Sequence, residues 1–533
     1  MSQGRAAEGT TRDAAASAAE WWRGAAIYEV YVRSFRDADG DGQGDLKGLI
    51  EGLDYLAALG IDAIWITPVS PSPNFDSGYD VLDYCAIAPA FGTMGDFKAL
   101  VAGAHARGLK VVLDQVYSHS SHLHPWFVES ASSRINPKAD WYVWADPKPD
   151  GGPPNNWLGR FGGFAWEWNG TRRQYYLHNF LIEQPDLNLH NPAVQSEVLA
   201  IMRFWFALGV DGLRLDVVNF YMHDPALRDN PPSRNDGSPN PYYLQAHVYD
   251  RSRPENLPFL SRMRAEADQA GARMLLGEIS CDAQIERMAE YTRPGRLHTA
   301  YSFELLGPRL SGVNVALAVE RAGADGAWPC WAFSSHDVVR VASRWRAVGH
   351  PARVKMLQAM LLCLRGSVVI YQGEELGLPH SEVPRHRLQD PEAIRFWPNH
   401  RGRDGARTPM PWTEEEPSLG FSRAEGWLPA EAAHRSLAIS VQETDPQSTL
   451  AHCRALLALR HGSSALRLGN WDVIDATETA LVFRRHHGEE SLICCFNWGE
   501  APIPVAQGAV SLAGGTQSGH LMPDSYVILK EQA

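Results

Sequence analysis

Four apolar runs of strand length, each ending in charged side chains, constrain the fold of this 533-residue chain more than any other feature. They are residues 111–119, 209–220, 274–280 and 331–340, and segments with helical periodicity separate them. In a (β/α)8 barrel the catalytic groups gather at the carboxyl ends of the strands, because these ends meet at one face. The sequence therefore predicts an α/β fold built on a (β/α)8 TIM barrel.

The run 209–220 holds Arg214 and Asp216 two positions apart, so strand alternation puts both side chains on one face. A lone buried carboxylate costs several kcal/mol, so such a residue is usually paired or functional. The pair is either a structural ion pair at a strand end or part of an active site. The three similar runs elsewhere in the chain favour an active site.

The length and the changes in pattern predict more than one domain. The βα rhythm stops over 120–185, which is rich in Trp, Pro and Gly, and short alternating runs begin at about residue 470. We expect a disordered tail over 1–20, a barrel over 21–119 and 186–469, an inserted domain over 120–185, and a C-terminal all-β sandwich over 470–533.

Composition and charge exclude several classes of protein. The net charge of −13 argues against nucleic-acid and anionic-membrane partners and favours a neutral or small substrate. The seven cysteines are scattered without metal-ligand spacing, which is typical of free thiols in a reducing compartment. No run of about 18 apolar residues could span a membrane, and the N-terminal segment lacks the apolar core of a signal peptide. We expect a cytoplasmic protein that is a monomer or weak homodimer.

An acidic loop follows the first predicted strand. Counted from Asp37, acidic residues stand at positions 1, 3, 5 and 9 with Gly at position 6, which matches the front of an EF-hand calcium loop. Position 12 is Gly48, so the bidentate Glu of that loop is missing. The loop is either an acidic turn without metal or a structural site for Ca²⁺ or Mg²⁺. The candidate ligands are Asp37, Asp39, Asp41, Asp45 and the backbone carbonyl of Gln43.

The charged strand ends carry a family resemblance that extends from about Tyr28 to the last residues. Four motifs resemble the signature regions of glycoside hydrolase family 13, the α-amylase family. A fifth motif, and the run Ala-Arg-Thr-Pro-Met beginning at Ala406, resemble the α-glucosidase and oligo-1,6-glucosidase branch. The five are Asp114-Gln-Val-Tyr-Ser-His119, Gly212-Leu-Arg-Leu-Asp216, Gly277-Glu278, Ser335-His-Asp337 and Gln184-Pro-Asp-Leu-Asn188.

The resemblance implies a retaining glycosidase whose inserted domain is the family's domain B. Retention needs two carboxyl groups about 5–5.5 Å apart across the scissile bond. Asp216 would be the nucleophile and Glu278 the general acid and base, and Asp337 would bind the sugar hydroxyls beside the reacting carbon. The implied metal is a divalent ion in the loop that starts at Asp37.

The resemblance also implies a glucose pocket with a closed far end. A pair formed by Asp76 and Arg407 would close that end and hold the terminal hydroxyl, so only a non-reducing terminal glucose would enter. The implied activity is exo-acting hydrolysis of short glucosides. The substrate-binding residues would be Asp76, Tyr79, His119, Phe161, Phe180, Arg214, His336 and Arg407.

Three activities remain open on the sequence. The first is hydrolysis of the terminal α-glucosyl unit of short oligosaccharides or glucosides. The second is glucosyl transfer or sugar isomerisation at the same site, in which a sugar replaces water as the acceptor. The third is a non-catalytic relative such as a transporter subunit, which the three carboxylates argue against. In the branch that the chain resembles, a Val just after the nucleophile, here Val217, accompanies acceptance of α-1,6 bonds, so the resemblance implies activity on such bonds.

Overall fold

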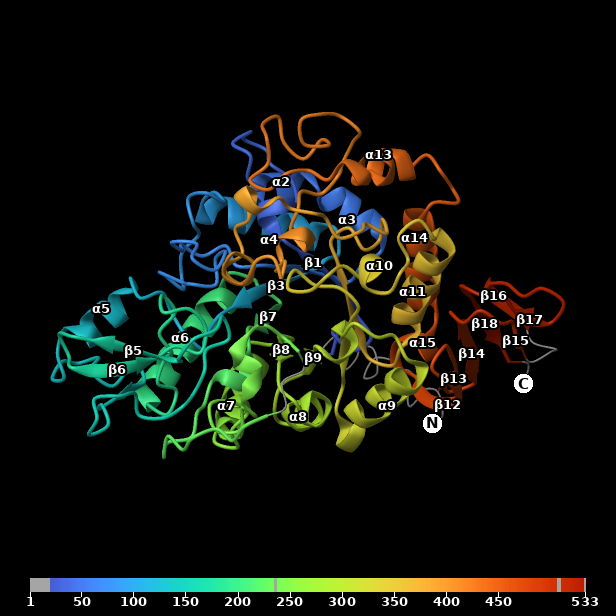
Figure 1. Cartoon of the computed structure of the whole chain (residues 1–533). Coiled ribbons are helices and arrows are strands. Elements are labelled where there is room, and N and C mark those ends of the chain that lie inside the picture. The colour runs from blue at the N-terminus through green and yellow to red at the C-terminus, as the bar shows by residue number, and fades with distance from the viewer. Residues whose placement is uncertain (1–19, 234–236, 506–509, 532–533) are drawn as a thin grey trace, which may run out of the picture.

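The computed structural model describes residues 20–233, 237–505 and 510–531. Eight parallel strands form the central sheet in the order β10-β11-β1-β2-β3-β7-β8-β9 (Figure 1). A parallel bridge between Ala300 and Pro329 joins the two outer strands and closes the barrel. The predicted barrel is therefore confirmed. Its strands are β1 (Ala26–Val30), β2 (Ala63–Ile66), β3 (Lys110–Gln115), β7 (Gly212–Leu215), β8 (Met274–Ile279), β9 (Thr299–Ser302), β10 (Cys330–Ala332) and β11 (Ser367–Tyr371).

Helices surround the barrel, and several of them begin at ordinary capping signals. Thr93 and Asp96 form a capping box at the start of α4, and Asn191 caps α6 just before a proline. The helical pattern over residues 46–59 is divided at Gly52, where a Cβ would lie 2.5 Å from the Phe35 ring. The main helices are α2 (Leu46–Glu51), α3 (Leu53–Leu59), α4 (Met94–Ala106), α6 (Pro192–Ala207), α7 (Asn256–Gln269), α8 (Gln284–Tyr291), α9 (Gly312–Ala322), α11 (Pro351–Cys363) and α14 (Thr449–Gly462).

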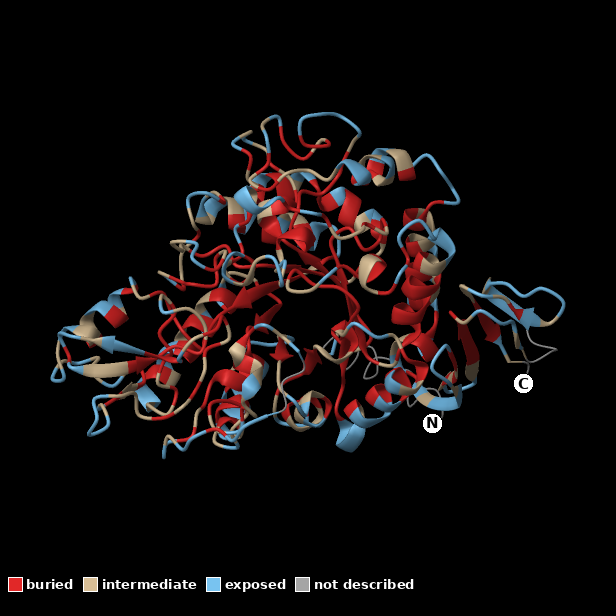
Figure 2. Ribbon diagram, in the orientation of Figure 1, coloured by how far each residue is buried: buried red, intermediate tan, exposed pale blue. Residues whose placement is uncertain are grey.

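Side-chain alternation along the strands builds two layers inside the barrel. A buried cluster that includes Ile27, Trp65, Val112 and Leu276 fills its interior. The barrel strands are buried along nearly their whole length (Figure 2). Two residues further along β1, β3 and β8, on the same face, the side chains are carboxylic acids: Glu29, Asp114 and Glu278. The charged layer therefore lies directly above an apolar plug, at the carboxyl ends of the strands.

A small subdomain lies between β3 and α6, to the left in Figure 1. It contains α5 (Pro125–Ser132) and an antiparallel sheet of order β4-β6-β5, with β4 at Trp144–Ala145, β5 at Trp166–Asn169 and β6 at Gln174–Leu177. Val143, Trp157, Trp166 and Leu177 belong to its own buried cluster. The loss of βα rhythm after residue 119 thus corresponds to an insertion with its own small core.

The C-terminal part is an antiparallel β domain at the right of Figure 1. Its five-stranded sheet has the order β12-β13-β14-β18-β16, and β15 pairs with β17 in a second small sheet. The fully buried Arg485 on β13 donates to the carbonyl oxygens of Cys363 and Leu466, which anchors this domain to the barrel helices. The strands are β12 (Asn470–Ala476), β13 (Ala480–His487), β14 (Glu490–Asn497), β15 (Ile503–Pro504), β16 (Val510–Gly514), β17 (His520–Leu521) and β18 (Ser525–Lys530).

Three further expectations concern the N-terminal tail, the cysteines and membrane-spanning helices. The predicted tail over 1–20 falls almost entirely on residues 1–19, which lie outside the described part of the chain. The seven cysteines are all free, as their scattered spacing predicts. Within the described residues, no helix combines the length and the apolar character needed to cross a bilayer.

Candidate active site

One buried guanidinium organises the charged layer. Arg214 Nη1 lies 2.9 Å from Asp114 Oδ1 and 2.7 Å from Asp216 Oδ1, and Nη2 lies 2.5 Å from Glu278 Oε2. Arg214 is fully buried, and a buried cation is stable only when its charge is compensated in this way. Three adjacent strands, β3, β7 and β8, therefore deliver three carboxylates to a single cation. Arg214 and Asp216 lie on the same face, as alternation predicts.

The charges and the burial around Arg214 favour a protonated carboxyl group. Burial raises the pKa of Asp216 and of Glu278, and each also feels the negative charge of neighbouring carboxylates, while Arg214 opposes the shift. One guanidinium cannot compensate all the carboxylates that surround it. The pair Asp216 and Glu278 therefore holds a proton at pH values at which isolated carboxyl groups have lost theirs.

The residue after Asp216 has a strained backbone. Val217 has φ 34° and ψ 50°, in the left-handed region that β-branched residues rarely adopt. Its N–H donates to Glu278 Oε2 at 3.0 Å. The unusual turn thus ties the end of β7 to the carboxylate at the end of β8, and strain of this kind is concentrated at functional sites.

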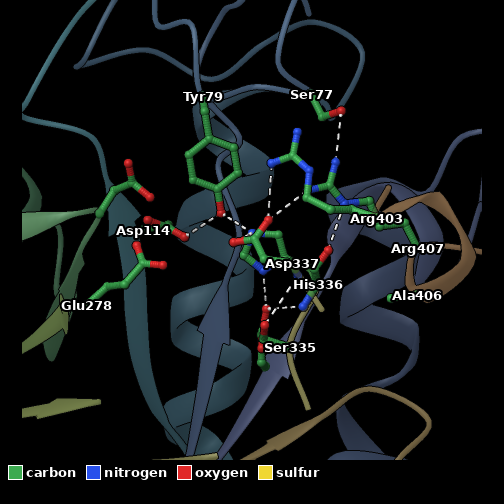
Figure 3. Close-up of polar contacts among 12 residues, drawn as sticks. Ser77, Tyr79, Asp114, Glu278, Ser335, His336, Asp337, Arg403, Ala406 and Arg407 are labelled. Atoms are coloured by element: carbon green, nitrogen blue, oxygen red, sulfur yellow. Dashed lines mark hydrogen bonds and ion pairs between the residues drawn. The ribbon is translucent and has the colours of Figure 1, made fainter. Parts of the chain in front are cut away.

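A second arm of the site follows β10 (Figure 3). The His336 ring is stacked on Tyr79 with the centroids 5.5 Å apart, and Nε2 lies 2.7 Å from the Tyr79 hydroxyl and 3.2 Å from Asp337 Oδ2. Its Nδ1 lies 2.5 Å from Glu29 Oε1. Burial lowers the pKa of His336 to about 3, so the imidazole is neutral at ordinary pH. His336 therefore bridges Glu29 and the Tyr79 hydroxyl through hydrogen bonds and lies against Asp337.

The predicted pair of Asp76 with Arg407 is wrong. Arg403 Nη2 lies 2.7 Å from Asp76 Oδ1, whereas Arg407 donates to Asp337 Oδ1 at 2.9 Å and to Ser77 Oγ at 3.3 Å. Arg403 and Arg407 flank one short 3-10 turn, so both guanidiniums reach Asp337 from the same side (Figure 3). Arg403 lies nearer the cavity and pairs with Asp76, whereas Arg407 is fully buried behind Asp337.

A cavity of about 440 Å³ lies above these carboxylates and brings most of the predicted residues together. Arg214, His336 and Arg407 lie behind its wall, where they contact the carboxylates rather than the open space. The structure thus separates residues that line the cavity from residues that hold the lining in place. The lining includes the predicted residues Asp76, Tyr79, His119, Phe161, Phe180, Asp216, Glu278 and Asp337.

His119 and two phenylalanines form the side of the cavity toward the inserted subdomain. The His119 ring lies 5.1 Å from the Phe180 ring, which lies 6.2 Å from the Phe161 ring. His119 Nε2 lies 3.2 Å from the Tyr79 carbonyl and 3.1 Å from Gln184 Nε2. Burial lowers the pKa of His119 to about 4, so this imidazole is also neutral.

Sequence reasoning missed several lining residues. Arg403 stands four positions before Arg407 in the same motif, so the motif alone could have suggested it. Most of the others stand on the long loop after β7 or on the loop after β11, where no local pattern marks them as lining. The missed residues include Arg403, Phe220, Tyr242, His247, Arg251, Gln284, Phe303 and Glu392.

The acidic loop after β1 gathers three of its predicted ligands. Oxygen atoms of Asp37, Asp39 and Asp45 lie within 4.8 Å of one another. Asp41 and Gln43 are not in this group, and Asp41 Oδ1 accepts from the Gln43 N–H at 2.8 Å. Desolvation and the neighbouring carboxylates raise the pKa of Asp39. Converging carboxylate oxygens that repel one another suit a hard divalent cation, so the residues present fit such an ion.

The chain resembles known proteins along nearly all its length. A probable α-glucosidase of Rhizobium meliloti (strain 1021) is 53% identical over 494 residues, which is 90% of this chain and 89% of the relative. An oligo-1,6-glucosidase of Halalkalibacterium halodurans is 35% identical over 518 residues, covering 90% and 91%. The crystal structure of the α-glucosyl transfer enzyme XgtA superposes with a TM-score of 0.93 at 49% identity, covering 96% and 99%.

The family assignment rests on the catalytic region itself. Residues 29–469 match the family model described as the catalytic domain of alpha amylase, and this range includes all four signature motifs and every lining residue named above. The resemblance predicted from the sequence is confirmed. The chain belongs to the α-amylase family.

Proposed function

We propose that the protein is an exo-acting, retaining α-glucosidase that hydrolyses the non-reducing terminal α-glucosyl unit of short oligosaccharides or glucosides. The observation that carries the proposal is the pair of carboxyl groups, Asp216 and Glu278, bound to the two ends of one guanidinium. Carboxyl groups that share one guanidinium are close together, as retention requires (about 5–5.5 Å) and inversion does not. The α-glucosidase among the relatives supports the same substrate class.

The chemistry assigns different work to the two carboxyl groups. Asp216 attacks the anomeric carbon and forms a glucosyl ester, while Glu278 gives its proton to the leaving oxygen. Glu278 then takes a proton from the water that cleaves the ester. The mechanism needs an ionised Asp216, a form that Arg214 stabilises and orients, and a protonated Glu278, a form that burial favours.

The remaining polar residues bind and orient the sugar. Asp337 lines the cavity beside Asp216, and the guanidiniums of Arg403 and Arg407 hold the pKa of Asp337 below its usual range although burial opposes this. An ionised Asp337 accepts hydrogen bonds from sugar hydroxyls and favours the charged transition state. His119, as a neutral donor or acceptor, contacts a hydroxyl from the other side.

The ion pair of Asp76 with Arg403 supports exo-action. Both residues line the cavity, and Arg403 also contacts Asp337. We infer that this charge network closes the far end of the cavity to a continuing sugar chain, so that only a terminal glucose fits. Product analysis tests this. The native enzyme should release single glucose units from disaccharides and leave soluble starch nearly untouched. Rapid shortening of starch with mixed oligosaccharides before glucose would contradict exo-action.

Glucosyl transfer is the second candidate function. The observation that favours it is the close similarity to the solved α-glucosyl transfer enzyme. The glucosyl ester of Asp216 is common to both reactions, and only the acceptor, water or another hydroxyl, differs. Chromatography of the products at high concentrations of an added sugar measures the partition between the two.

We further infer that the loop from Asp37 to Asp45 holds a structural Ca²⁺ or Mg²⁺, with Asp37, Asp39 and Asp45 as its first ligands. Asp37 and Asp45 are buried while Asp39 is exposed, so the ion would be reached from the surface. Asp45 also caps α2 by accepting the Gly48 N–H at 2.7 Å. The ion would therefore tie the end of β1 to the first barrel helix.

Removal of this ion should lower the melting temperature, because a ligand that binds only the native state stabilises it. The expected measurement is thermal unfolding before and after chelation, with metal content determined by elemental analysis. Asp39→Asn should lower the melting temperature of the metal-loaded protein and weaken its response to chelation. An unchanged melting temperature after demonstrated loss of metal would contradict the structural role.

A further inference from the structure

The cavity wall beside the exposed Asp282 contains an arginine that lies between two aromatic rings. Arg251, on the long loop that follows β7, has its guanidinium carbon 5.3 Å from the Phe220 ring centroid and 5.5 Å from the Tyr242 ring centroid. Its Nη1 donates to the Tyr242 hydroxyl at 2.7 Å. Aromatic faces on two sides and a hydroxyl at one end fix the guanidinium rigidly in the cavity wall.

The hydrogen bonds of Arg251 are incomplete. The residue is only 5% exposed, yet among the described residues its Nε has no hydrogen-bond partner. The carboxylate nearest to its Nη2 is Asp282, at 3.9 Å, and that side chain is largely exposed. The Nη2 atom makes no hydrogen bond among the described residues and, unlike Nε, it is not enclosed by the protein. A donor at a cavity wall is completed by water or by a ligand, and because Arg251 lines the cavity, the partner of Nη2 is an atom of the bound molecule.

The charges around the cavity restrict which ligand atom that is. Three cationic side chains line it, and Arg403 and Arg160 are already paired, with Asp76 and with Glu392. The lining carboxylates outnumber these cations. They are Asp76, Asp216, Glu278, Asp282, Asp337 and Glu392. An anionic ligand would be repelled by this excess, whereas a neutral hydroxyl can accept from the guanidinium and donate to a carboxylate.

We propose that Arg251 is the acceptor-side specificity residue: it binds a hydroxyl oxygen of a neutral leaving sugar, and of a neutral alcohol that replaces water. The proposal rests on the proposed glucosidase function and names the class of molecule that binds in the part of the cavity beside Arg251 and Asp282. Asp282, which also lines the cavity, accepts from a second hydroxyl of the same molecule.

The transfer step balances without any further reagent. The hydroxyl oxygen of the bound alcohol attacks the anomeric carbon of the glucosyl ester, and the bond between that carbon and the Asp216 oxygen breaks. The hydroxyl proton passes to the Glu278 carboxylate. A glucoside is formed, Asp216 is released as a carboxylate, and Glu278 is again protonated for the next cycle.

The test compares two substrates that differ only in the leaving group. A disaccharide has a hydroxyl-bearing leaving sugar, whereas α-glucosyl fluoride releases a fluoride ion that has no hydroxyl for Arg251 to bind. In Arg251→Gln, the ratio of kcat/KM on the disaccharide to kcat/KM on the fluoride should fall about tenfold or more, as expected for loss of a charged hydrogen bond. Transfer to added glycerol should fall with it.

Matched variants separate binding from folding. Arg253→Gln is the control, because Arg253 stands on the same loop, contacts the Val248 carbonyl and does not line the cavity. Arg251→Lys keeps the charge but lacks the planar fork whose Nη1 binds Tyr242 while Nη2 is left for the ligand, so its ratio should also fall. Thermal unfolding checks each variant. An unchanged ratio in folded Arg251→Gln and Arg251→Lys, whether both rates fall together or neither falls, would overturn the proposal.

The preference for a neutral molecule is tested in the native enzyme. The disaccharide that it hydrolyses best should be cleaved about tenfold or more faster than the same disaccharide carrying a phosphate on its leaving sugar. Equal or faster cleavage of the phosphorylated form would overturn the neutral class. Failure of the native enzyme to hydrolyse α-glucosyl fluoride at all would instead contradict the proposed glucosidase function.

Discussion

Replacement of Asp216 with Asn is expected to lower kcat on short glucosides roughly 10⁴-fold or more, as found when a catalytic nucleophile is removed. The amide cannot form the glucosyl ester, although it fills the same space. Arg214 keeps its contacts with Asp114 and Glu278, so the fold should survive. Steady-state kinetics on p-nitrophenyl α-glucoside measure the loss, and circular dichroism with thermal unfolding verifies the structure.

Glu278→Gln should lose roughly 10²–10⁴-fold, the usual contribution of a general acid and base. In Glu278→Ala, added azide should restore turnover of α-glucosyl fluoride and give α-glucosyl azide. Fluoride needs little help in leaving, and azide attacks the ester without a base. Rates close to those of the native enzyme in folded Asp216→Asn, or in folded Glu278→Gln, would contradict the assignment.

Arg403→Ala is expected to produce the second largest loss. Arg403 contacts Asp76 at 2.7 Å, Asp390 at 2.8 Å and Asp337 at 3.2 Å, and its side chain is 13% exposed. Removing one partner of such a buried network costs about 3–5 kcal/mol, because the carboxylates lose their compensating charge. This cost weakens the binding of the glucose unit in the transition state, so kcat/KM on disaccharides should drop about 10²–10⁴-fold.

Arg401→Ala serves as the matched control, since Arg401 stands two positions away and pairs with the exposed Glu382 at the surface. It should leave kcat/KM within a small factor of the native value, as surface ion pairs contribute little. A comparable loss in both variants would mean that the loop, rather than the charge on Asp76 and Asp337, is what Arg403 supports.

The barrel and its charged rim could be predicted because each depends on local pattern. Apolar runs that end in Asp114, Asp216, Glu278 and Asp337 follow the strand and helix periods, and the carboxyl ends of parallel strands meet at one edge. The small core of the inserted subdomain, by contrast, was visible only as a loss of rhythm with many tryptophans.

The errors lie where several loops meet. Arg403 and Arg407 share one motif, and only the three-dimensional turn between them decides which one reaches Asp76. Arg251 stands in a loop without periodicity, so no local sequence pattern indicates that it contacts Phe220 and Tyr242. Packing between segments that are distant in the sequence decides which loop residues line the cavity. The spacing of residues along the chain does not reveal that packing.

The anomeric configuration of the first product tests the central claim most directly. Time-resolved proton NMR of p-nitrophenyl α-glucoside hydrolysis follows the single sugar product before it equilibrates. Retention through a glucosyl ester of Asp216 predicts that α-glucose appears first and that β-glucose follows only at the rate of spontaneous mutarotation. Initial release of β-glucose would contradict the covalent mechanism and the assigned roles of Asp216 and Glu278.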